Sequence, residues 1–381
     1  MKNTIYKYIF YEFSVYFITA LLALSSIVWT VQAVNYLDLV TEDGHAFSIY
    51  FLYSLLTLSK ILTKLIPFCF LLACVFTILK LEKDNELIIL WSSGLNKIYI
   101  VNYLIRISLI IMFLQLTLTT IINPKLLHLS RTVLKNSEFE FVSSMFKEKK
   151  FNDAVEGLTV FNSKKNNDKS YSDLLIRDES SVITSAGSKS STIFAKSGYV
   201  SKDETKLILQ NGFIHKKDYA NKIDVVKFEK TTLNIKGIST KSINKPKIQE
   251  TKTLDMIRCI RRNLDTHKTK FEVTHNCQKT KRGIMDTRIE LNKRFGMPFF
   301  IPVIALVCSF LLSSRRDKKT YIYNKYIYFF ISFVILTIAE ITVRYSGNSW
   351  SHSAVYYLIP IATIPLFYFT LLKKFKYENL F

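Results

Sequence analysis

Glycine and proline are scarce in this chain of 381 residues, which holds 10 glycines and 7 prolines. No two glycines stand five residues apart, as the GxxxxGKS/T phosphate loop requires, and none stand four apart, as the GxSxG nucleophile elbow requires. We therefore predict that the chain has no P-loop of its own and no hydrolase elbow. So little glycine and proline also excludes collagenous and low-complexity architectures.

Histidine and cysteine are also rare, with six and five copies. There is no HExxH and no CxxC, and His267, His275 and Cys277 lack the spacing of a zinc site, so we predict neither a metal site nor a cofactor. No paired acid and base or nucleophile constellation stands out, so we predict no catalytic residues. Cys259 and Cys277 could form a disulfide or remain free thiols, and the sequence is compatible with both.

Apolar residues, in contrast, make up 49% of the chain. The hydrocarbon core of a bilayer is about 30 Å thick, and a helix that rises 1.5 Å per residue needs about 20 apolar residues to cross it. Several runs are long enough, which excludes a wholly soluble globular protein. We predict three transmembrane helices near each end of the chain, at residues 13–34, 65–79 extended back to 49, 98–122, 296–314, 321–343 and 353–372.

The first of these runs could also be a cleavable signal peptide, with Lys2 and Lys7 as its basic region. The apolar run is longer than the usual signal core of about 7–15 residues, and no A-x-A cleavage site follows it. We therefore expect an uncleaved membrane helix.

Basic residues exceed acidic ones by 52 to 30, which gives a formal net charge of +22. Lysine is spread evenly and no RNP-like aromatic motif accompanies it, so we predict no nucleic-acid partner. Basic residues in short loops mark the cytoplasmic side of a membrane protein. This rule predicts that both termini lie in the cytoplasm and that the central region lies outside. The basic residues on the predicted cytoplasmic side are Lys2, Lys7, Lys80, Lys83, Lys97, Arg315, Arg316, Lys318, Lys319, Lys373, Lys374 and Lys376.

The central region shows the period-two alternation of half-buried strands. The β-type runs are at residues 158–161, 174–176, 181–184, 192–195, 206–215 and 225–235. Asn211-Gly212 suits the type I′ turn of a hairpin, in which both central residues need positive φ. We predict an α-helical membrane protein with an inserted antiparallel β-sandwich or β-jelly-roll domain. The expected divisions are helices at 1–124, the β domain at 125–250, a connector at 251–295 and helices at 296–381.

Ionisable groups in membrane spans are functional candidates, because each costs roughly 2.5–3.5 kcal/mol or more at the bilayer centre. Lys60 and Lys64 lie one helical turn apart near the outer end of the second span. They could extend to the lipid headgroups, or they could bind a lipid phosphate or carboxylate. Arg106 lies near the cytoplasmic end of the third span and is expected to extend to that surface. Glu340 and Arg344, four residues apart, are expected to form a structural pair.

The short cytoplasmic segment between the second and third spans is the most informative one. Asp84 or Asn85 can cap a two-turn helix that ends at Gly94. Three apolar residues of this helix share one face: Leu87, Leu90 and Trp91. The helix could lie on the membrane, or it could couple the spans to a partner protein by docking in its groove.

Several of these motifs resemble the YjgP/YjgQ permease family, which comprises LptF and LptG of the lipopolysaccharide exporter. The resemblance extends over essentially the whole chain. It rests on the three-plus-three layout and on short matches at residues 35–40 with Gly44, 65–67, 85–90, 93–95 and 290–291 with Arg294 and Pro298. Within the family, residues 150–161 are more similar to LptF than to LptG.

The resemblance implies a half-transporter that pairs with a paralogous LptG-like permease on a dimer of a cytosolic LptB-like ATPase. It implies extraction of lipopolysaccharide from the inner membrane and its transfer by the periplasmic β domain to an LptC-like bridge protein. Glu86 matches the family's acidic residue that faces the ATPase, so Glu86, Leu87, Leu90 and Trp91 are the expected coupling residues. Lys60 matches a basic position that in LptG-like relatives faces the lipid headgroup.

One departure from the family concerns the outer end of the first span, where relatives carry basic residues and this chain has the uncharged Gln32, Ala33 and Tyr36. The resemblance therefore does not extend to headgroup contact from that helix. An alternative function is a membrane-anchored sensor or scaffold whose β domain binds a periplasmic partner without transport.

Overall fold

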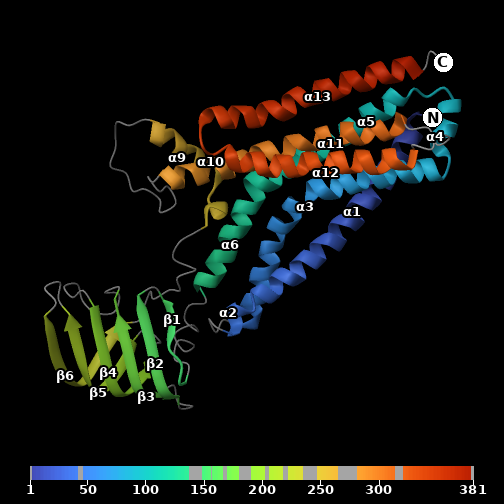
Figure 1. Ribbon diagram of the computed structural model, residues 1–381. Helices are drawn as coiled ribbons and strands as arrows, with labels where there is room; N and C mark the ends of the chain where they lie inside the picture. The colour runs from blue at the N-terminus through green and yellow to red at the C-terminus, as the bar shows by residue number, and fades with distance from the viewer. Residues whose placement is uncertain are drawn as a thin grey trace. The chain divides into compact units, whose positions relative to one another are not determined.

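The computed structural model describes residues 2–41, 46–136, 148–155, 157–165, 170–179, 190–201, 206–217, 222–234, 247–264, 281–313 and 321–378 (Figure 1). The chain divides into two compact units. The helical unit comprises Met1–Val31, Thr57–His128 and Lys247–Phe381, and the sheet unit comprises Gln32–Leu56 and Leu129–Pro246.

Six helical stretches of the described chain are long and apolar enough to cross a membrane, three on each side of the strands in sequence, as predicted. They run over Thr4–Val40, Phe47–Lys83, Lys97–Leu134, Arg282–Ser313, Lys325–Tyr345 and Trp350–Lys376. Their helices are α1 (Lys2–Asn35), α2 (Asp38–Thr41), α3 (Phe47–Lys83), α5 (Lys97–Thr117), η1 (Leu118–Ile122), α6 (Asn123–Asn136), α10 (Lys281–Gly296), η3 (Met297–Phe299), α11 (Phe300–Ser309), η4 (Phe310–Ser313), α12 (Tyr321–Tyr345) and α13 (Trp350–Glu378).

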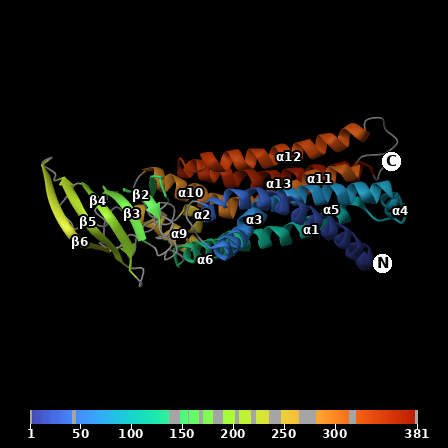
Figure 2. The same cartoon turned by 90° about the horizontal axis from the view of Figure 1, so that it is seen from below.

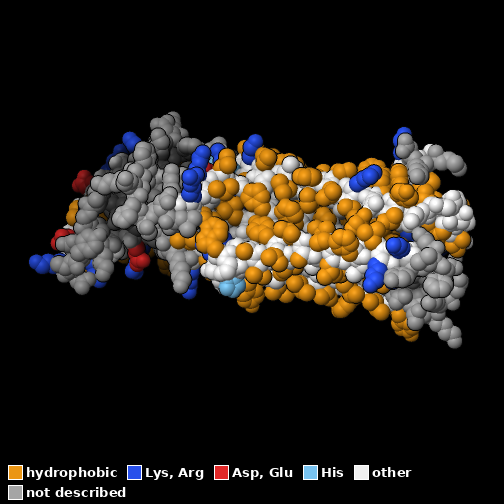
Figure 3. All heavy atoms as spheres, turned by 90° about the horizontal axis from the view of Figure 1, so that it is seen from above, with side chains coloured by type: hydrophobic (Ala, Val, Ile, Leu, Met, Phe, Trp, Pro, Cys, Tyr) orange, Lys and Arg blue, Asp and Glu red, His pale blue; other side chains and the backbone are white. Residues whose placement is uncertain are grey.

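The core of the helical unit forms around α11, whose ten residues are all buried. α11 packs against α5, α12 and α13, and these helices lie around it in both ribbon views (Figures 1 and 2). In the most apolar window of the fourth span 78% of the residues are buried, against 6% in the first span. The fourth span is therefore the centre of the unit and the first is peripheral. On the face of the helices that Figure 3 shows, the exposed side chains are largely hydrophobic, as contact with lipid requires.

The connector that returns to the membrane spans consists of η2 (Ile248–Glu250) and α9 (Thr253–Leu264). Arg294 of α10 is only 3% exposed and fixes the connector to the helices. Its guanidinium donates to the carbonyl oxygens of Gln249 and Thr251 and to Thr253 Oγ1, each at 2.9 Å. Met256 and Ile260 of α9 pack on Leu291 of α10. The helical run of the third span continues through α6 to Asn136, past residue 124, where we expected the helices to end.

The strands form one antiparallel sheet in which each strand pairs with its neighbours in sequence. They are β1 (Asn152–Val155), β2 (Leu158–Lys165), β3 (Ser170–Asp178), β4 (Ser190–Val200), β5 (Lys206–Lys217) and β6 (Ile223–Asn234). The inserted antiparallel domain is as predicted, and its described strands form one sheet in the order of a meander. The predicted strand at 181–184 lies outside the described residues.

The predicted turn at Asn211-Gly212 is wrong, because both residues lie inside the twelve-residue β5. Asn211 does have positive φ, at 53°. This φ reverses the side-chain alternation: Leu209 is buried before Asn211 and Gly212 after it. Gly212 is needed for close packing, since a Cβ there would lie 2.0 Å from the carbonyl oxygen of Phe194. The Asn-Gly pair therefore produces a kink within a strand and not a chain reversal.

The side-chain alternation reverses at the same level in the neighbouring strands, along a row of residues that lie opposite one another. Asp173 of β3 also has positive φ, at 49°, and the register of the flanking pairs places it opposite Lys196 of β4. Lys196 in turn lies opposite Asn211, which lies opposite Glu229 of β6. Because the alternation reverses in neighbouring strands along this row, the apolar side chains on both sides of it reach the same buried face, as do Leu174 and Leu209.

Asn211→Val is expected to destabilise the sheet by about 1–2 kcal/mol, because a β-branched residue adopts positive φ only with strain. Asn211→Gly is the matched control, since glycine reaches this φ without a Cβ clash. The measurement is the urea concentration at which β5 of the full chain becomes cleavable in pulse proteolysis. Equal midpoints for the two variants would contradict the assignment of a φ constraint at this position.

Candidate functional site

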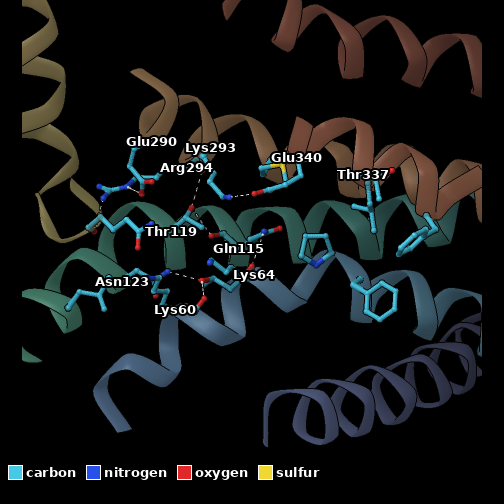
Figure 4. Close-up of a pocket in the computed structure, with 18 residues that line it drawn as sticks. Lys60, Lys64, Gln115, Thr119, Asn123, Glu290, Lys293, Arg294, Thr337 and Glu340 are labelled. Carbon is cyan, nitrogen blue, oxygen red and sulfur yellow. Dashed lines mark hydrogen bonds and ion pairs between the residues drawn. The ribbon is translucent and has the colours of Figure 1, made fainter. Parts of the chain in front are cut away.

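A cavity of about 400 Å³ opens in the helical unit, lined by α3, α5, η1, α6, η2, α10, η3 and α12 (Figure 4). One part of its lining is polar and charged, and comprises Lys60, Thr63, Lys64, Gln115, Thr119, Asn123, Gln249, Glu290, Lys293, Arg294, Thr337 and Glu340. The other part is apolar and comprises Pro67, Phe68, Leu127, Met297, Phe333 and Leu336. The cavity thus joins a charged surface to a hydrophobic one.

This division follows from the order of residues along two helices. In α3, Lys60 and Lys64 precede Phe68, and in α12, Phe333 and Leu336 precede Glu340. Phe68 and Phe333 meet edge to face, with ring centroids 6.1 Å apart. At 1.5 Å per residue, Lys60 and Phe68 are separated by about 12 Å along the helix axis. An amphiphilic molecule matches such a cavity, with its anionic head at the lysines and its apolar part at the rings.

The charged part of the cavity has an excess of positive charge. It contains four cationic groups and two carboxylates. Lys293 of α10 forms an ion pair with Glu340 of α12, and Arg294 Nε lies 3.1 Å from Glu290 Oε1. Neither Lys60 nor Lys64 forms an ion pair within the described part of the chain. Two ammonium groups therefore line the cavity without an ion pair to any described residue, although the carboxylates of Glu290 and Glu250 act on Lys60 from a longer distance.

Pro67 shapes the polar wall of the cavity. Proline has no N–H, so the carbonyl oxygen of the residue four positions earlier, Thr63, loses its helical hydrogen bond. Gln115 Nε2 of α5 donates to that oxygen at 3.3 Å, and Asn123 Nδ2 of α6 donates to Thr63 Oγ1 at 2.8 Å. Thr119 Oγ1 donates to the carbonyl oxygen of Arg294 at 3.0 Å. The third span therefore supplies the hydrogen-bond donor for the carbonyl oxygen that Pro67 leaves without a partner in the second span.

Sequence reasoning missed Gln115, Thr119 and Asn123. Their signal is a spacing of four residues, which places polar side chains along one face of an otherwise apolar run. The same stretch contains the π-helix η1, Leu118–Ile122. Single π-turns inside helices frequently occur at functional sites.

The partner of Glu340 differs from the one that we expected. Its carboxylate contacts Lys293 of α10, and Arg344 is exposed, with no ion pair to Glu340 among the residues that the structure describes. The spacing of four residues permitted the pair with Arg344, but α10 packs against α12 and brings Lys293 to the carboxylate. Arg106 is exposed on α5.

The segment between the second and third spans forms α4, Glu86–Ser92, after Asn85 and before Gly94. Asn85 has φ of 58° and makes no side-chain cap, so the helix begins at a left-handed turn and not at the expected cap. The Tyr8 hydroxyl of α1 donates to Glu86 Oε1 at 2.9 Å. Close by in sequence, Lys80 Nζ of α3 and Glu12 Oε2 of α1 are 2.7 Å apart. Polar contacts therefore connect α1 to α3 and α4.

The apolar face of α4 points toward the chain itself. Leu87 is 6% exposed, and Leu90 and Trp91 pack on the core of the helical unit. These residues share one face, as predicted, but the face packs on the chain's own core, so it does not present these side chains to a partner. The outward residues are Ile88 and Ile89, which are 58% and 63% exposed.

The cysteines fall into two groups. Cys69, Cys74 and Cys308 are free and buried, and Cys259 of α9 is disulfide-bonded. Cys277 lies outside the described residues, as do His267 and His275. Within the described ranges, no group of three or more His, Cys, Asp or Glu residues could hold a metal ion.

Comparison with known proteins identifies the family. An uncharacterised protein of Rickettsia prowazekii (strain Madrid E), RP871, is 28% identical over 177 residues, which is 46% of this chain and 47% of that protein. The match therefore covers about half the length of this curated relative. The model of the family described as lipopolysaccharide export system permease LptF/LptG matches residues 7–374, which is nearly the whole chain. This chain, with its six membrane helices and inserted antiparallel sheet, belongs to the LptF/LptG family of lipopolysaccharide export permeases.

Proposed function

We propose that the chain is one of two permease subunits of an ABC-type exporter, which extracts lipopolysaccharide from the inner membrane and passes it to a periplasmic bridge toward the outer membrane. Membership of the family supports a permease role in lipopolysaccharide export. The observation that carries the proposal is the cavity of about 400 Å³, in which unpaired ammonium groups adjoin an aromatic surface. This combination suits a lipid with an anionic head.

Lys60 and Lys64 are the proposed headgroup ligands. Two unpaired ammonium groups on one helical face repel each other, and an anion between them removes that repulsion. A phosphate group carries up to two negative charges and accepts hydrogen bonds from several donors. Polar lining groups at Gln115 and Asn123 border the same space. The headgroup would therefore bind at the charged part of the cavity while acyl chains contact Phe68 and Phe333.

The proposed energy source is a dimeric cytosolic ATPase of the LptB type. Each CH₂ group that leaves the membrane costs about 0.8 kcal/mol, so a lipid with several acyl chains does not leave spontaneously. The chain has no glycine pair with P-loop spacing. The work must therefore come from a partner that hydrolyses ATP.

The proposed contact with this ATPase is α4. Its outward Ile88 and Ile89 offer apolar surface, and Glu86 lies at the start of the same helix. Leu87, Leu90 and Trp91, which we expected to enter the partner's groove, instead fix the helix to the spans. We therefore assign partner contact to Ile88, Ile89 and the Glu86 carboxylate, and anchoring to the other face.

The remaining proposed partners are a paralogous LptG-like permease and an LptC-like bridge protein, which makes this chain the LptF subunit. The 6% burial of the first span leaves most of its apolar surface for lipid or a second subunit. We place the sheet in the periplasm and both termini in the cytoplasm. The disulfide of Cys259 supports this orientation, because such bonds persist in oxidising compartments.

The orientation predicts opposite labelling of two cysteine variants. Lys227→Cys in β6 should react with a membrane-impermeant maleimide added outside spheroplasts, and Asp84→Cys should react only after the membrane is opened, since both positions are exposed. The unsubstituted chain measures the background from its native cysteines. Reaction of both variants from the same side would overturn the topology.

Lys60→Glu should reduce crosslinking of a photoactivatable lipopolysaccharide several-fold, because it places a carboxylate against the lipid phosphate, and Lys60→Arg should largely retain crosslinking. Lys373→Glu is the matched control, since it reverses a charge at an exposed position outside the cavity. Equal crosslinking by all four proteins would mean that Lys60 does not hold the headgroup.

Glu86→Ala should impair ATP-dependent release of lipopolysaccharide from proteoliposomes, and Glu86→Lys should impair it more, because like charges then meet at a partly desolvated contact. Tyr8→Phe removes the hydrogen bond inside the chain and keeps the carboxylate, so it is the matched control. Complex assembly is checked by pull-down with the ATPase. Release as low in Tyr8→Phe as in Glu86→Ala would assign Glu86 to anchoring, and normal release by Glu86→Lys would contradict coupling through this helix.

A further inference from the structure

The ion pair between Lys293 and Glu340 lies on the wall of the cavity, next to the two unpaired lysines in the charged part of the lining (Figure 4). It joins α10 to α12 at the cavity lining. Both side chains are partly accessible, with 31% of Lys293 and 41% of Glu340 exposed. The pair is therefore within reach of a molecule that enters the cavity.

The other cationic group of α10 is not available to a ligand in the same way. Arg294 is 3% exposed and already binds Glu290, two carbonyl oxygens of the connector and Thr253 Oγ1. Among the described residues, Lys293 has one charged partner, which is Glu340. Within the described part of the chain, Lys60 and Lys64 form no ion pair, and Lys293 pairs with Glu340. Arg294 already binds Glu290 and the connector.

This arrangement sets up a competition for Lys293. An anion that binds Lys60 and Lys64 enters the cavity that the Glu340 carboxylate also lines, and the two negative charges repel each other there. Lys293 can turn from Glu340 to the ligand, because a phosphate oxygen is an equally good acceptor for its ammonium group, and the attraction between Lys293 and the ligand then offsets the repulsion from Glu340. Glu340 thus lowers the affinity of the cavity for an anion, and it is the described residue that pairs with Lys293 when the ligand has left.

We propose that Glu340 is a resident counter-anion, which an anionic lipid headgroup displaces from Lys293 on entry and which takes Lys293 back on release. The inference rests on the proposed function, since it concerns the same cavity. It adds two consequences. Bound lipid weakens the link between α10 and α12, and competition from Glu340 limits the affinity for the lipid, so the lipid can leave. Glu340 acts through Lys293 and is therefore a positioning residue.

The exchange predicts an order of affinities for four proteins. Glu340→Gln removes the competitor and should bind lipopolysaccharide roughly tenfold more tightly than the unsubstituted chain. Lys293→Gln leaves an unpaired carboxylate in the cavity and should bind more weakly. The double variant restores a neutral pair and should bind about as tightly as the unsubstituted chain. Glu340→Asp keeps the charge and should bind as the unsubstituted chain does.

The measurement is the binding of fluorescently labelled lipopolysaccharide to the assembled exporter complex in nanodiscs, with ATP-driven release measured on the same samples. Glu340→Gln should bind more tightly and release more slowly, whereas a purely structural role would lower both binding and release. Unchanged or weaker binding by Glu340→Gln overturns the proposal. If this variant does not assemble, the double variant must bind more tightly than Lys293→Gln, and equal binding by these two overturns the proposal as well.

A further variant separates this proposal from the one that it rests on. Lys60→Gln should weaken binding in every background, because it removes a primary headgroup ligand. If Lys60→Gln leaves binding unchanged, the cavity is not the headgroup site and both proposals fail. If Lys60→Gln weakens binding but Glu340→Gln does not strengthen it, the site stands and the exchange at Lys293 is refuted.

Discussion

A polar group inside a membrane must find its hydrogen-bond partners within the protein, and this requirement organises the helical unit. Pro67 leaves a carbonyl oxygen of α3 without its helical partner, and the Gln115 amide of α5 supplies one. Arg294 is buried, and Glu290 and the connector satisfy its guanidinium group. Against this background, Lys60 and Lys64 of the cavity stand out, because neither forms an ion pair with a described residue. A bound anion would supply the negative charge that these ammonium groups lack, as the proposed headgroup site requires.

Two adjacent residues of α10 connect the cavity to the connector. Lys293 contacts α12 at the cavity wall, and Arg294 holds η2 and the start of α9. Thr253 Oγ1 donates to the carbonyl oxygen of Thr120 in η1 at 2.6 Å, so the same contact also includes the third span. A change in the charge of the cavity therefore acts on the helix that carries the attachment of the connector. No long chain of contacts is needed, because the two side chains are neighbours in sequence.

The sequence predicted the features that depend on local composition. Apolar runs identified the six spans, and period-two alternation identified β2, β3, β4 and β6. Features that depend on the packing of distant segments could not be read in this way. Asn211-Gly212 has the composition of a turn, but hydrogen bonds to β4 and β6 on both sides keep the chain extended. The partner of Glu340 likewise came from α10, 47 residues away in sequence, and not from the next helical turn.

The helix α4 shows why a correct periodicity does not identify an interface. Leu87, Leu90 and Trp91 share a face, and any amphipathic pattern states only that one face is buried, not by what. In this chain the helical unit itself buries that face, while the Tyr8 hydroxyl holds the first turn through Glu86. These contacts link α4 to α1 and to the core of the helical unit. In the proposed coupling, a displacement of Ile88 and Ile89 by the ATPase is therefore passed to the spans through these contacts.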